Sequence, residues 1–326
     1  MTNKTYAVSI RDTIAQEMRH DEKVFIMGED IEVLGGIFGC TRDLAREFGT
    51  DRVRNTPISE AAFVGAGIGA ASAGMRPIVE LMYMDFTYVA MDQLLNQAAK
   101  IRYMFGGKAQ IPLVIRGQQG IGRGNAGQHS QSVESLFMHI PGLKVACPST
   151  PAEAAGLLRT AIRDNNPVMF FEHKALYSTK GDVPDDPEFC IPFGQADIKR
   201  EGSDVTIVSN LLYVSKALEA AELLEKEGIS AEVIDLRTLV PLDIDTVIAS
   251  VTKTGRLITV HEAHHDCGWG AEVASQVTEK AFRYLDAPPI RLGARMCTLP
   301  FNLGLENAVV PQVSEIVAAA KQSLYR

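Results

Sequence analysis

Short apolar runs alternate with amphipathic stretches through most of this 326-residue chain. This alternation is typical of a parallel α/β sheet, because each parallel strand needs a crossover, usually helical, to bring the chain back to the same end of the sheet. Flanking turn residues and residue spacing separate the two kinds of segment. In the first half we expect strands at 24–27, 77–81, 112–115, 143–146 and 168–171, and helices at 9–20, 60–73, 87–105, 131–139 and 151–164.

A polar stretch then interrupts the pattern, and residues 181–200 show no clear period. Beyond it the alternation resumes, with strands expected at 205–208, 232–236 and 257–260 and helices at 215–226, 244–251 and 271–284. The length of the chain also allows two domains. We therefore predict an α/β fold with a parallel-sheet domain at 1–185, a linker at 186–200 and a second α/β domain at 201–326.

Charge and composition exclude several classes of function. A net charge of −8 without any basic run argues against nucleic acid as a partner. No apolar stretch reaches membrane-spanning length, and the first residues lack the layout of a signal peptide. Five scattered cysteines, none in a Cys-x-x-Cys pair, indicate a reduced, cytoplasmic compartment.

After Glu60 the chain becomes rich in small residues, with glycine, alanine or serine at 65–67 and 69–74. Ser59 can cap a helix that starts there, and the small residues let a backbone or a flat ligand lie close against it. A carboxylate in a first helical turn should be ionised and able to accept a hydrogen bond. Two interpretations stay open, a group for proton chemistry and a simple capping carboxylate.

Two motifs match known patterns only formally. Gly65-x-Gly67-x-x-Ala70 lacks the strand that a dinucleotide-binding turn needs directly before it, since 55–60 cannot form that strand. His261-Glu262-x-x-His265 requires one helix to bind zinc, whereas we expect a strand at 257–260 followed by a loop. The polar residues of that loop still have the position to contact a ligand or partner.

A glycine-rich loop follows the strand expected at 112–115 and leads to His129. No Gly-Lys-Ser/Thr closes it, so it is not a nucleoside-triphosphate loop. It predicts a backbone that approaches a substrate, with an imidazole able to move protons near neutral pH. The alternative is a mobile surface loop with a capping histidine. Its five glycines are Gly117, Gly120, Gly122, Gly124 and Gly127.

One expected set of ligands is missing from the chain. No Gly-Asp-Gly is followed by an asparagine about 25 residues later, and a diphosphate bound through a divalent metal needs such oxygen ligands. If a cofactor with a diphosphate is used, we expect another chain to hold its phosphates.

Together these residues resemble the β subunit of the thiamine diphosphate-dependent component of 2-oxo acid or acetoin dehydrogenase complexes, in the transketolase-like superfamily. The resemblance covers almost the whole chain, and the order of the segments makes it specific. Those segments are FIMGED (25–30), TPISE (56–60), RPIVELM (76–82), QHSQ (128–131), AIRDNNP (161–167) and EVIDLR (232–237). It implies a pyrimidine-binding N-terminal domain and a transketolase-like C-terminal domain.

The resemblance implies a role for each candidate residue. Glu60 would hydrogen-bond the aminopyrimidine ring of thiamine diphosphate and so promote loss of the thiazolium proton, after which the cofactor acts as electron sink. Phe86 would stack on the pyrimidine, unless it only packs in the core, and Ile58 and Glu29 would line that end. His129 would transfer protons or position an intermediate.

It also implies ions and partners. A monovalent cation, with potassium as the expected ion, would be held by backbone carbonyls at Leu113, Ala161, Ile162, Asp164 and Asn166. An α subunit would hold the diphosphate and Mg²⁺, giving a heterotetramer of two α and two β subunits. The acyl group would pass to a lipoyl domain, and the C-terminal domain would dock the acyltransferase core.

The substrate and one other class of enzyme stay open. Segments 92–100, 103–109 and 172–174 resemble the acetoin branch, 268–272 resembles the pyruvate branch, and 297–300 departs from the usual family pattern. A split transketolase or transaldolase would need basic residues for a sugar phosphate, for which Arg116 and Arg123 are candidates. A non-catalytic paralogue is disfavoured because Glu60 and His129 are both present.

Overall fold

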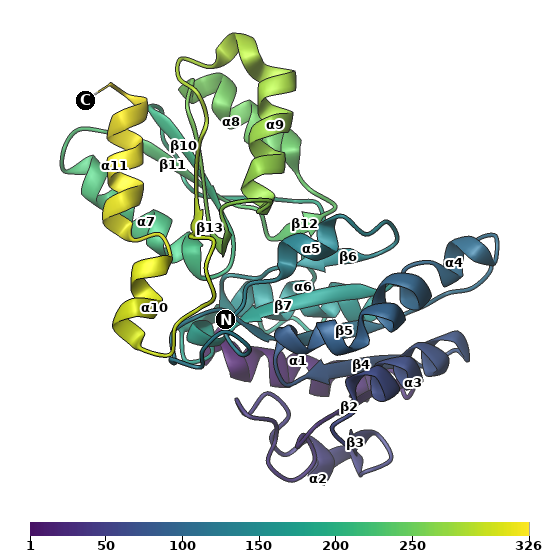
Figure 1. Ribbon diagram of the computed structural model, residues 1–326. Coiled ribbons are helices and arrows are strands. Elements are labelled where there is room, and N and C mark those ends of the chain that lie inside the picture. Colours follow the sequence, from purple (N-terminus) through teal and green to yellow (C-terminus); the bar gives the residue numbers. More distant parts are fainter. Residues whose placement is uncertain (326) are drawn as a thin grey trace. The chain divides into compact units, whose positions relative to one another are not determined.

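The computed structural model describes residues 1–325 and divides into two units (Figure 1). The first unit contains Met1–Gln119 and Leu136–Phe193, and the second contains Gly120–Ser135 together with the chain from Gly194 onward. The chain thus passes between units inside the range 186–200. The segment Gly120–Ser135, which we had assigned by sequence order to the first domain, groups with the second unit.

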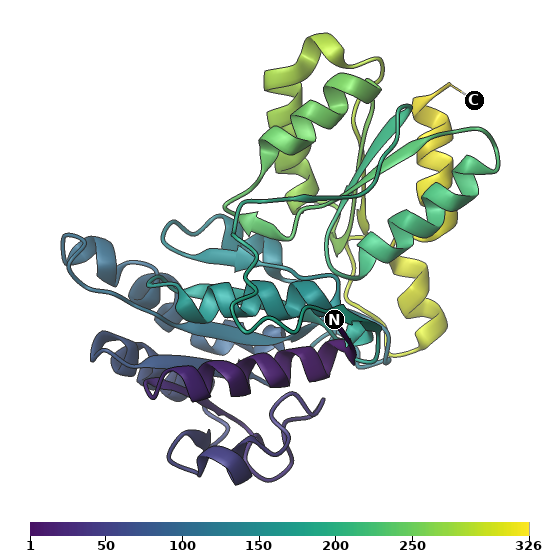
Figure 2. The same cartoon turned by 180° about the vertical axis from the view of Figure 1, so that it is seen from behind.

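The first unit is built on a parallel sheet with strand order β6-β7-β5-β4-β2-β3. Helices α1 and α6 lie side by side on one face of this sheet and α3 on the opposite face (Figures 1 and 2). A separate antiparallel pair joins β1 to β8. The strands are β1 (Thr2–Thr5), β2 (Val24–Gly28), β3 (Val53–Asn55), β4 (Arg76–Leu81), β5 (Val114–Gln119), β6 (Lys144–Ala146), β7 (Val168–His173) and β8 (Lys180–Val183).

The helices of this unit begin where the sequence supplies caps. Thr150 and Glu153 form a capping box at the start of α6, and Pro151 is the first helical residue. Thr5 caps α1 by accepting a hydrogen bond from the amide of Val8. The helices are α1 (Tyr6–His20), α2 (Leu44–Phe48), α3 (Glu60–Ser72), α4 (Ile101–Met104), α5 (Glu134–Met138, which starts at the unit boundary) and α6 (Pro151–Arg163), with the 3₁₀ helix η3 (Lys174–Leu176).

The single helix predicted at 87–105 is wrong. A 3₁₀ helix η1 (Met84–Ala90), a π-helix η2 (Gln93–Ala98) and the short α4 occupy this stretch instead. Leu94 and Ala98 are buried as expected, but Ile101 is only half-buried. Tight 3₁₀ turns and wide π turns rotate later positions off the face that a straight α-helix would keep aligned.

The second unit has its own sheet, with order β14-β13-β10-β11-β9 and only β9 antiparallel. Its core packs α7 and α11 against the strands. The elements are β9 (Asp197–Arg200), β10 (Val205–Ser209), α7 (Leu212–Glu225), β11 (Ala231–Asp235), β12 (Thr238–Val240), α8 (Ile244–Thr254), β13 (Leu257–His264), α9 (Trp269–Ala281), η4 (Phe282–Tyr284), β14 (Ile290–Ala294), α10 (Leu303–Val309) and α11 (Val313–Ser323).

Strand β13 corrects one expectation and β9 adds to another. β13 continues to His264, so His261 and Glu262 lie within the strand and not in a loop after it. β9 lies inside the range predicted as linker and pairs with β11. Both segments mix polar and apolar residues. Their pattern therefore does not predict a strand, because each strand is stabilised mainly by its neighbours in the sheet. No helix within residues 1–325 is long and apolar enough to cross a bilayer.

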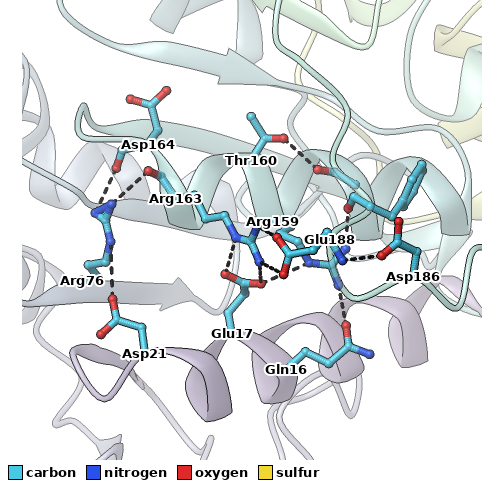
Figure 3. A network of polar contacts seen from close by, with 12 residues as sticks. Gln16, Glu17, Asp21, Arg76, Arg159, Thr160, Arg163, Asp164, Asp186 and Glu188 are labelled. Carbon is cyan, nitrogen blue, oxygen red and sulfur yellow. Dashed lines mark hydrogen bonds and ion pairs between the residues drawn. The ribbon is translucent and has the colours of Figure 1, made fainter.

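A buried ion-pair network joins α1 to α6 (Figure 3). Glu17 and Arg159 each have about 3% of the side chain exposed, and Arg159 Nε lies 3.1 Å from Glu17 Oε1. Arg163 donates two further bonds of 2.9 Å to the same carboxylate. Gln16 and the Phe189 carbonyl accept from the other Arg159 nitrogens, so the guanidinium is satisfied on every side.

Glu17→Ala should lower the free energy of unfolding by about 3–5 kcal/mol, because it leaves the buried Arg159 guanidinium without its counter-charge. The matched control is Glu47→Ala, which removes an exposed pair with Arg19 on the same helix α1 and should cost about 0–1 kcal/mol. Urea unfolding of both variants measures the difference. Equal losses in the two variants would contradict a special role for the buried network.

Candidate active site

Glu29, Ile58, Glu60 and Phe86 gather at one edge of the first sheet. Glu29 directly follows β2, Ile58 and Glu60 follow β3, and Phe86 lies in η1 just after β4. These three strands are parallel neighbours, so their carboxyl ends meet at the same edge, where open α/β sheets bind ligands. The packing of η1 against α3 brings the residues after β4 next to the start of that helix.

Glu60 is the first residue of α3 and is buried, with 6% exposed. The expected cap is wrong: the Ser59 side chain makes no capping hydrogen bond, since its backbone (φ −160°, ψ 75°) departs from the usual extended conformation. The small residues of α3 serve close packing instead. A Cβ added to Gly67 would lie 2.7 Å from Val79 on β4, so the helix sits directly on the sheet.

The dinucleotide-binding motif fails as predicted, because no strand stands directly before it. Strand β3 ends at Asn55, and helix α3 has already begun at Glu60. Gly65 and Gly67 therefore lie inside α3, and neither forms the turn that would surround a pyrophosphate.

Glu29 carries the clearest electrostatic signal of this edge. Burial, then the charge of Glu60, then that of Asp30 raise the pKa of Glu29 to about 7. Its Oε1 atom is buried and has no hydrogen-bond partner within residues 1–325. Neither Glu29 nor Glu60 forms an ion pair with a cation in that part of the chain. Two neighbouring buried carboxyls therefore share a site that favours retention of a proton near neutral pH.

The two apolar candidates differ in their surroundings. Phe86 is half-buried and meets Tyr83 edge to face, with ring centroids 5.9 Å apart, so one side of the ring is supported. Ile58 is 85% exposed, which leaves its side chain uncovered by this chain. The structure thus supplies an aromatic surface and an exposed apolar side chain beside the carboxyl pair.

A buried charge cluster lies close to this edge, and sequence reasoning missed it. Arg116 donates to both oxygens of Glu172, at 2.6 and 2.5 Å, and also to Glu80. Tyr177 donates to Glu172 over 2.7 Å. A small cavity touches both this cluster and Glu29. The sequence did offer a signal for this cluster, namely the charged residues that stand within or at the end of apolar strands.

This cluster corrects the use suggested for Arg116. Its side chain is 2% exposed and lies between two carboxylates, so it is not available to hold a sugar phosphate. Both carboxylates and burial act on the guanidinium, and the net effect raises the pKa of Arg116 well above its ordinary value. The arginine is a structural counter-ion for Glu80 and Glu172.

The carbonyls predicted to bind a monovalent cation lie in the first unit, around the end of α6. The Leu113 carbonyl accepts from Val168 and the Ala161 carbonyl accepts from Asp164, which leaves each oxygen a second lone pair. The Asp164 carboxylate bonds Lys144 and Asn166, and its pKa is lowered by those donors against the opposing effect of burial. Within residues 1–325 no group of three or more acidic, histidine or cysteine side chains is placed to hold a metal ion.

His129 belongs to the second unit. It is half-buried in the segment Gly120–Ser135, and its amide donates to the Ala126 carbonyl over 3.3 Å. The capping alternative is wrong, because α5 starts only at Glu134. Two buried glutamates of the same unit, Glu262 and Glu306, accept hydrogen bonds from this segment.

The histidine motif at 261–265 is not a zinc site. His261 is buried on β13, where burial lowers its pKa to about 4. Its ring packs at a tilt of 47° against that of Trp269, with centroids 4.8 Å apart, and Nδ1 lies 3.0 Å from the Ala263 carbonyl. Four residues of extended chain span roughly 13 Å, and His265 lies beyond the end of β13, so the helical spacing of the motif has no meaning here.

Comparisons with known proteins decide the family. Residues 3–180 match the transketolase pyrimidine-binding domain and residues 194–316 match the transketolase C-terminal domain. The β subunits of acetoin:2,6-dichlorophenolindophenol oxidoreductase from Cupriavidus necator and Bacillus subtilis are 50% and 47% identical, each covering 97% of this chain and 96% of the relative. The pyruvate dehydrogenase E1 component subunit beta of Rhizobium meliloti is 45% identical, covering 100% of this chain and 71% of the relative.

This chain belongs to the family of pyruvate and acetoin dehydrogenase β subunits. The resemblance stated from the sequence motifs is therefore confirmed. Two solved structures share the fold. A split-gene transketolase, described as an inactive β tetramer, has a TM-score of 0.79 at 23% identity and covers 98% of each chain. A transketolase of Pichia stipitis has a TM-score of 0.73 at 14% identity, covering 100% of this chain and 47% of that one. The predicted α/β fold class is confirmed.

Glu29→Gln should stabilise the chain at neutral pH. Glu29 has a pKa of about 7 in the folded chain, above its ordinary 4.5. The contribution of Glu29 to stability is therefore fully present below pH 4.5 and is lost as the pH rises through about 7. Glutamine removes this loss, so the melting temperature of the variant should exceed that of wild type by a few degrees at pH 8 and converge with it near pH 4.5. Thermal scans across this range test the prediction. A difference between the two proteins that does not change with pH would contradict it.

Proposed function

We propose that this chain is the β subunit of a thiamine diphosphate-dependent 2-oxo acid or acetoin dehydrogenase, which cleaves a C–C bond and passes the acyl group to lipoamide. One observation carries the proposal: Glu60, buried in the first turn of α3, stands beside Glu29, whose pKa is raised to about 7, at the carboxyl edge of a pyrimidine-binding domain. The names of the relatives favour this function over a split transketolase.

The residues at this edge fit an aminopyrimidine. The ring is flat and presents nitrogen donors, which match the half-buried face of Phe86, the Glu60 carboxylate and the partnerless Glu29 Oε1. The bound cofactor supplies a thiazolium carbon acid and an electron sink. Glu60 would accept a hydrogen bond from the ring nitrogen and would favour the tautomer that takes up a proton, and Glu29 would keep a proton close by because its pKa is raised.

We assign His129 a later role than Glu60. It lies in a glycine-rich segment, and its imidazole ring can both donate and accept a hydrogen bond. In this assignment His129 transfers a proton to the carbonyl substrate or positions it, and takes no part in activating the cofactor.

The chain needs an α subunit to complete the site. It lacks a diphosphate-binding Gly-Asp-Gly motif, so the α subunit would hold Mg²⁺ and the phosphates. Exposed apolar side chains stand at the same edge as Glu29 and Glu60: Val33 at 83%, Leu34 at 66%, Ile58 at 85% and Val89 at 57%. Apolar groups gathered at one edge favour a protein surface that covers them. The complete enzyme would contain two α and two β subunits and would dock on a lipoyl-bearing acyltransferase core.

We also propose a structural monovalent cation, with potassium as the first choice, at the carbonyls of Leu113, Ala161, Ile162, Asp164 and Asn166. The last turn of α6 leaves carbonyls without helical partners, and its negative dipole end favours a cation. Arg76 donates to the neighbouring Arg163 carbonyl over 2.9 Å, and this contact supports a site that favours positive charge at the end of the helix.

The purified chain alone should neither bind thiamine diphosphate tightly nor decarboxylate a 2-oxo acid, because the phosphate and Mg²⁺ ligands are absent. Addition of the α subunit should restore both properties. Calorimetric titration with cofactor and Mg²⁺, with and without the α subunit, checks this. Tight binding by the isolated chain would refute the divided site.

Glu60→Gln and His129→Ala should slow different steps of the reconstituted enzyme. Glu60→Gln should reduce turnover by about a hundredfold or more and slow hydrogen–deuterium exchange at the thiazolium carbon. His129→Ala should slow turnover while that exchange stays within about twofold of wild type, because His129 acts after activation. NMR of the exchange and steady-state turnover measure both effects. Equal slowing of exchange in the two variants would assign His129 to activation instead.

A further inference from the structure

The segment that carries His129 is closed on itself at its base. The Gly120 amide donates to the Gln131 carbonyl over 3.2 Å, so the two ends of the loop meet. His129 lies just inside this closure. All of these residues belong to the second unit, and what fixes the loop within that unit therefore fixes the backbone of His129.

Glu262 on β13 holds the base of the loop. Its Oε1 accepts from the Ile121 amide at 2.8 Å and from the Ser132 hydroxyl at 2.9 Å, which ties one residue from each side of the loop to one oxygen. Glu262 is 7% exposed. A buried carboxylate that bonds both sides of a loop opposes their separation, since opening would remove these two donors from the oxygen.

Glu306 on α10 holds the outer part of the loop. Its Oε2 accepts from the amides of Gly122 at 3.1 Å and Gly124 at 3.4 Å. The residue is completely buried, and no lysine, arginine or histidine within residues 1–325 forms an ion pair with it. The loop amides are the donors that compensate the burial of this carboxylate, so the loop and α10 stabilise each other.

The loop fits closely against the segment before α10. Gly124 has φ +61°, and a Cβ there would lie 2.6 Å from the Phe301 carbonyl. A Cβ on Gly127 would lie 2.3 Å from the Thr298 side chain. These glycines allow the loop backbone to reach the Glu306 carboxylate, which explains two members of the glycine-rich pattern without reference to substrate.

We propose that Glu262 and Glu306 form a carboxylate clamp that positions His129, with Glu306 as the decisive positioning residue. Glu306 does not touch the reacting atoms. It acts by holding the Gly122–Gly124 backbone, and a displacement of about 1 Å at a catalytic group is enough to reduce a rate by about a hundredfold. This inference rests on the role proposed above for His129.

Three variants on the full chain test the clamp. Glu306→Ala removes the oxygen that accepts from both loop amides. Glu306→Gln keeps an oxygen acceptor on a side chain of the same length, and Gly124→Ala disturbs the contact while the carboxylate stays intact. Glu232→Ala is the matched control, because Glu232 is a fully buried carboxylate of the same unit that bonds Lys253 and Gly202 and not the loop. His129→Ala is measured beside them.

Amide hydrogen exchange and reconstituted turnover are the two measurements. In Glu306→Ala and Gly124→Ala, loop amides should exchange at least about tenfold faster and kcat should fall about tenfold to a hundredfold, with thiazolium exchange within about twofold of wild type. Glu306→Gln should recover most of the slow loop exchange and most of the kcat of wild type. Glu232→Ala should lower the melting temperature without changing loop exchange.

The outcomes separate the clamp from the role of His129. The positioning role would be overturned if loop amides in Glu306→Ala exchanged at the wild-type rate. It would also be overturned if they exchanged faster while Glu306→Ala kept full turnover and His129→Ala was slow. Full turnover in His129→Ala would overturn the role proposed for His129, and the loop-exchange result would still report on the clamp. A loss of turnover in Glu232→Ala equal to that in Glu306→Ala would show a general stability effect and overturn the inference.

Discussion

Burying a carboxylate requires something to compensate the lost hydration, and this chain meets the requirement in different ways. Glu17 is held by Arg159 and Arg163, and Glu80 and Glu172 are held by Arg116. Glu306 relies on backbone amides of the loop that it binds. Glu29 and Glu60 have no cation within residues 1–325, and the cost is visible in the raised pKa of Glu29. The compensated carboxylates stabilise the fold, and the uncompensated pair is where a ligand with nitrogen donors is most favoured.

The parallel sheet explains why that pair exists at all. Side chains that follow neighbouring parallel strands meet at one edge, even when long stretches of chain separate them. Glu29 and Glu60 are brought together because β2 pairs directly with β3, and Phe86 joins them because β4 pairs with the other side of β2. The pairing and register of these three strands therefore determine the electrostatics of the site even without a bound cofactor.

Much of this arrangement was predictable from the sequence. The period of the apolar residues located most central strands and helices, and the position of Glu60 before a small-residue helix marked it as unusual. The pKa of Glu29 was not predictable, since it depends on a neighbour supplied by strand pairing. Arg116 was misinterpreted for the same reason: its charge suggested a phosphate ligand, whereas Glu80 and Glu172 already surround it. The split of the helix predicted at 87–105 depends on local turn geometry that spacing does not report.

The largest departure from sequence order is the grouping of Gly120–Ser135 with the second unit. The chain leaves β5 at Gln119 and returns to the first unit at Leu136, and the sixteen residues between are bonded to β13 and α10. Under the proposed roles, the carboxyl pair that activates the cofactor and the histidine that acts on the substrate are built on different units. A residue such as Glu306, remote in sequence from every motif, can then affect the second step without affecting the first. Separate structural support for the two steps is what allows their energetic contributions to be measured independently.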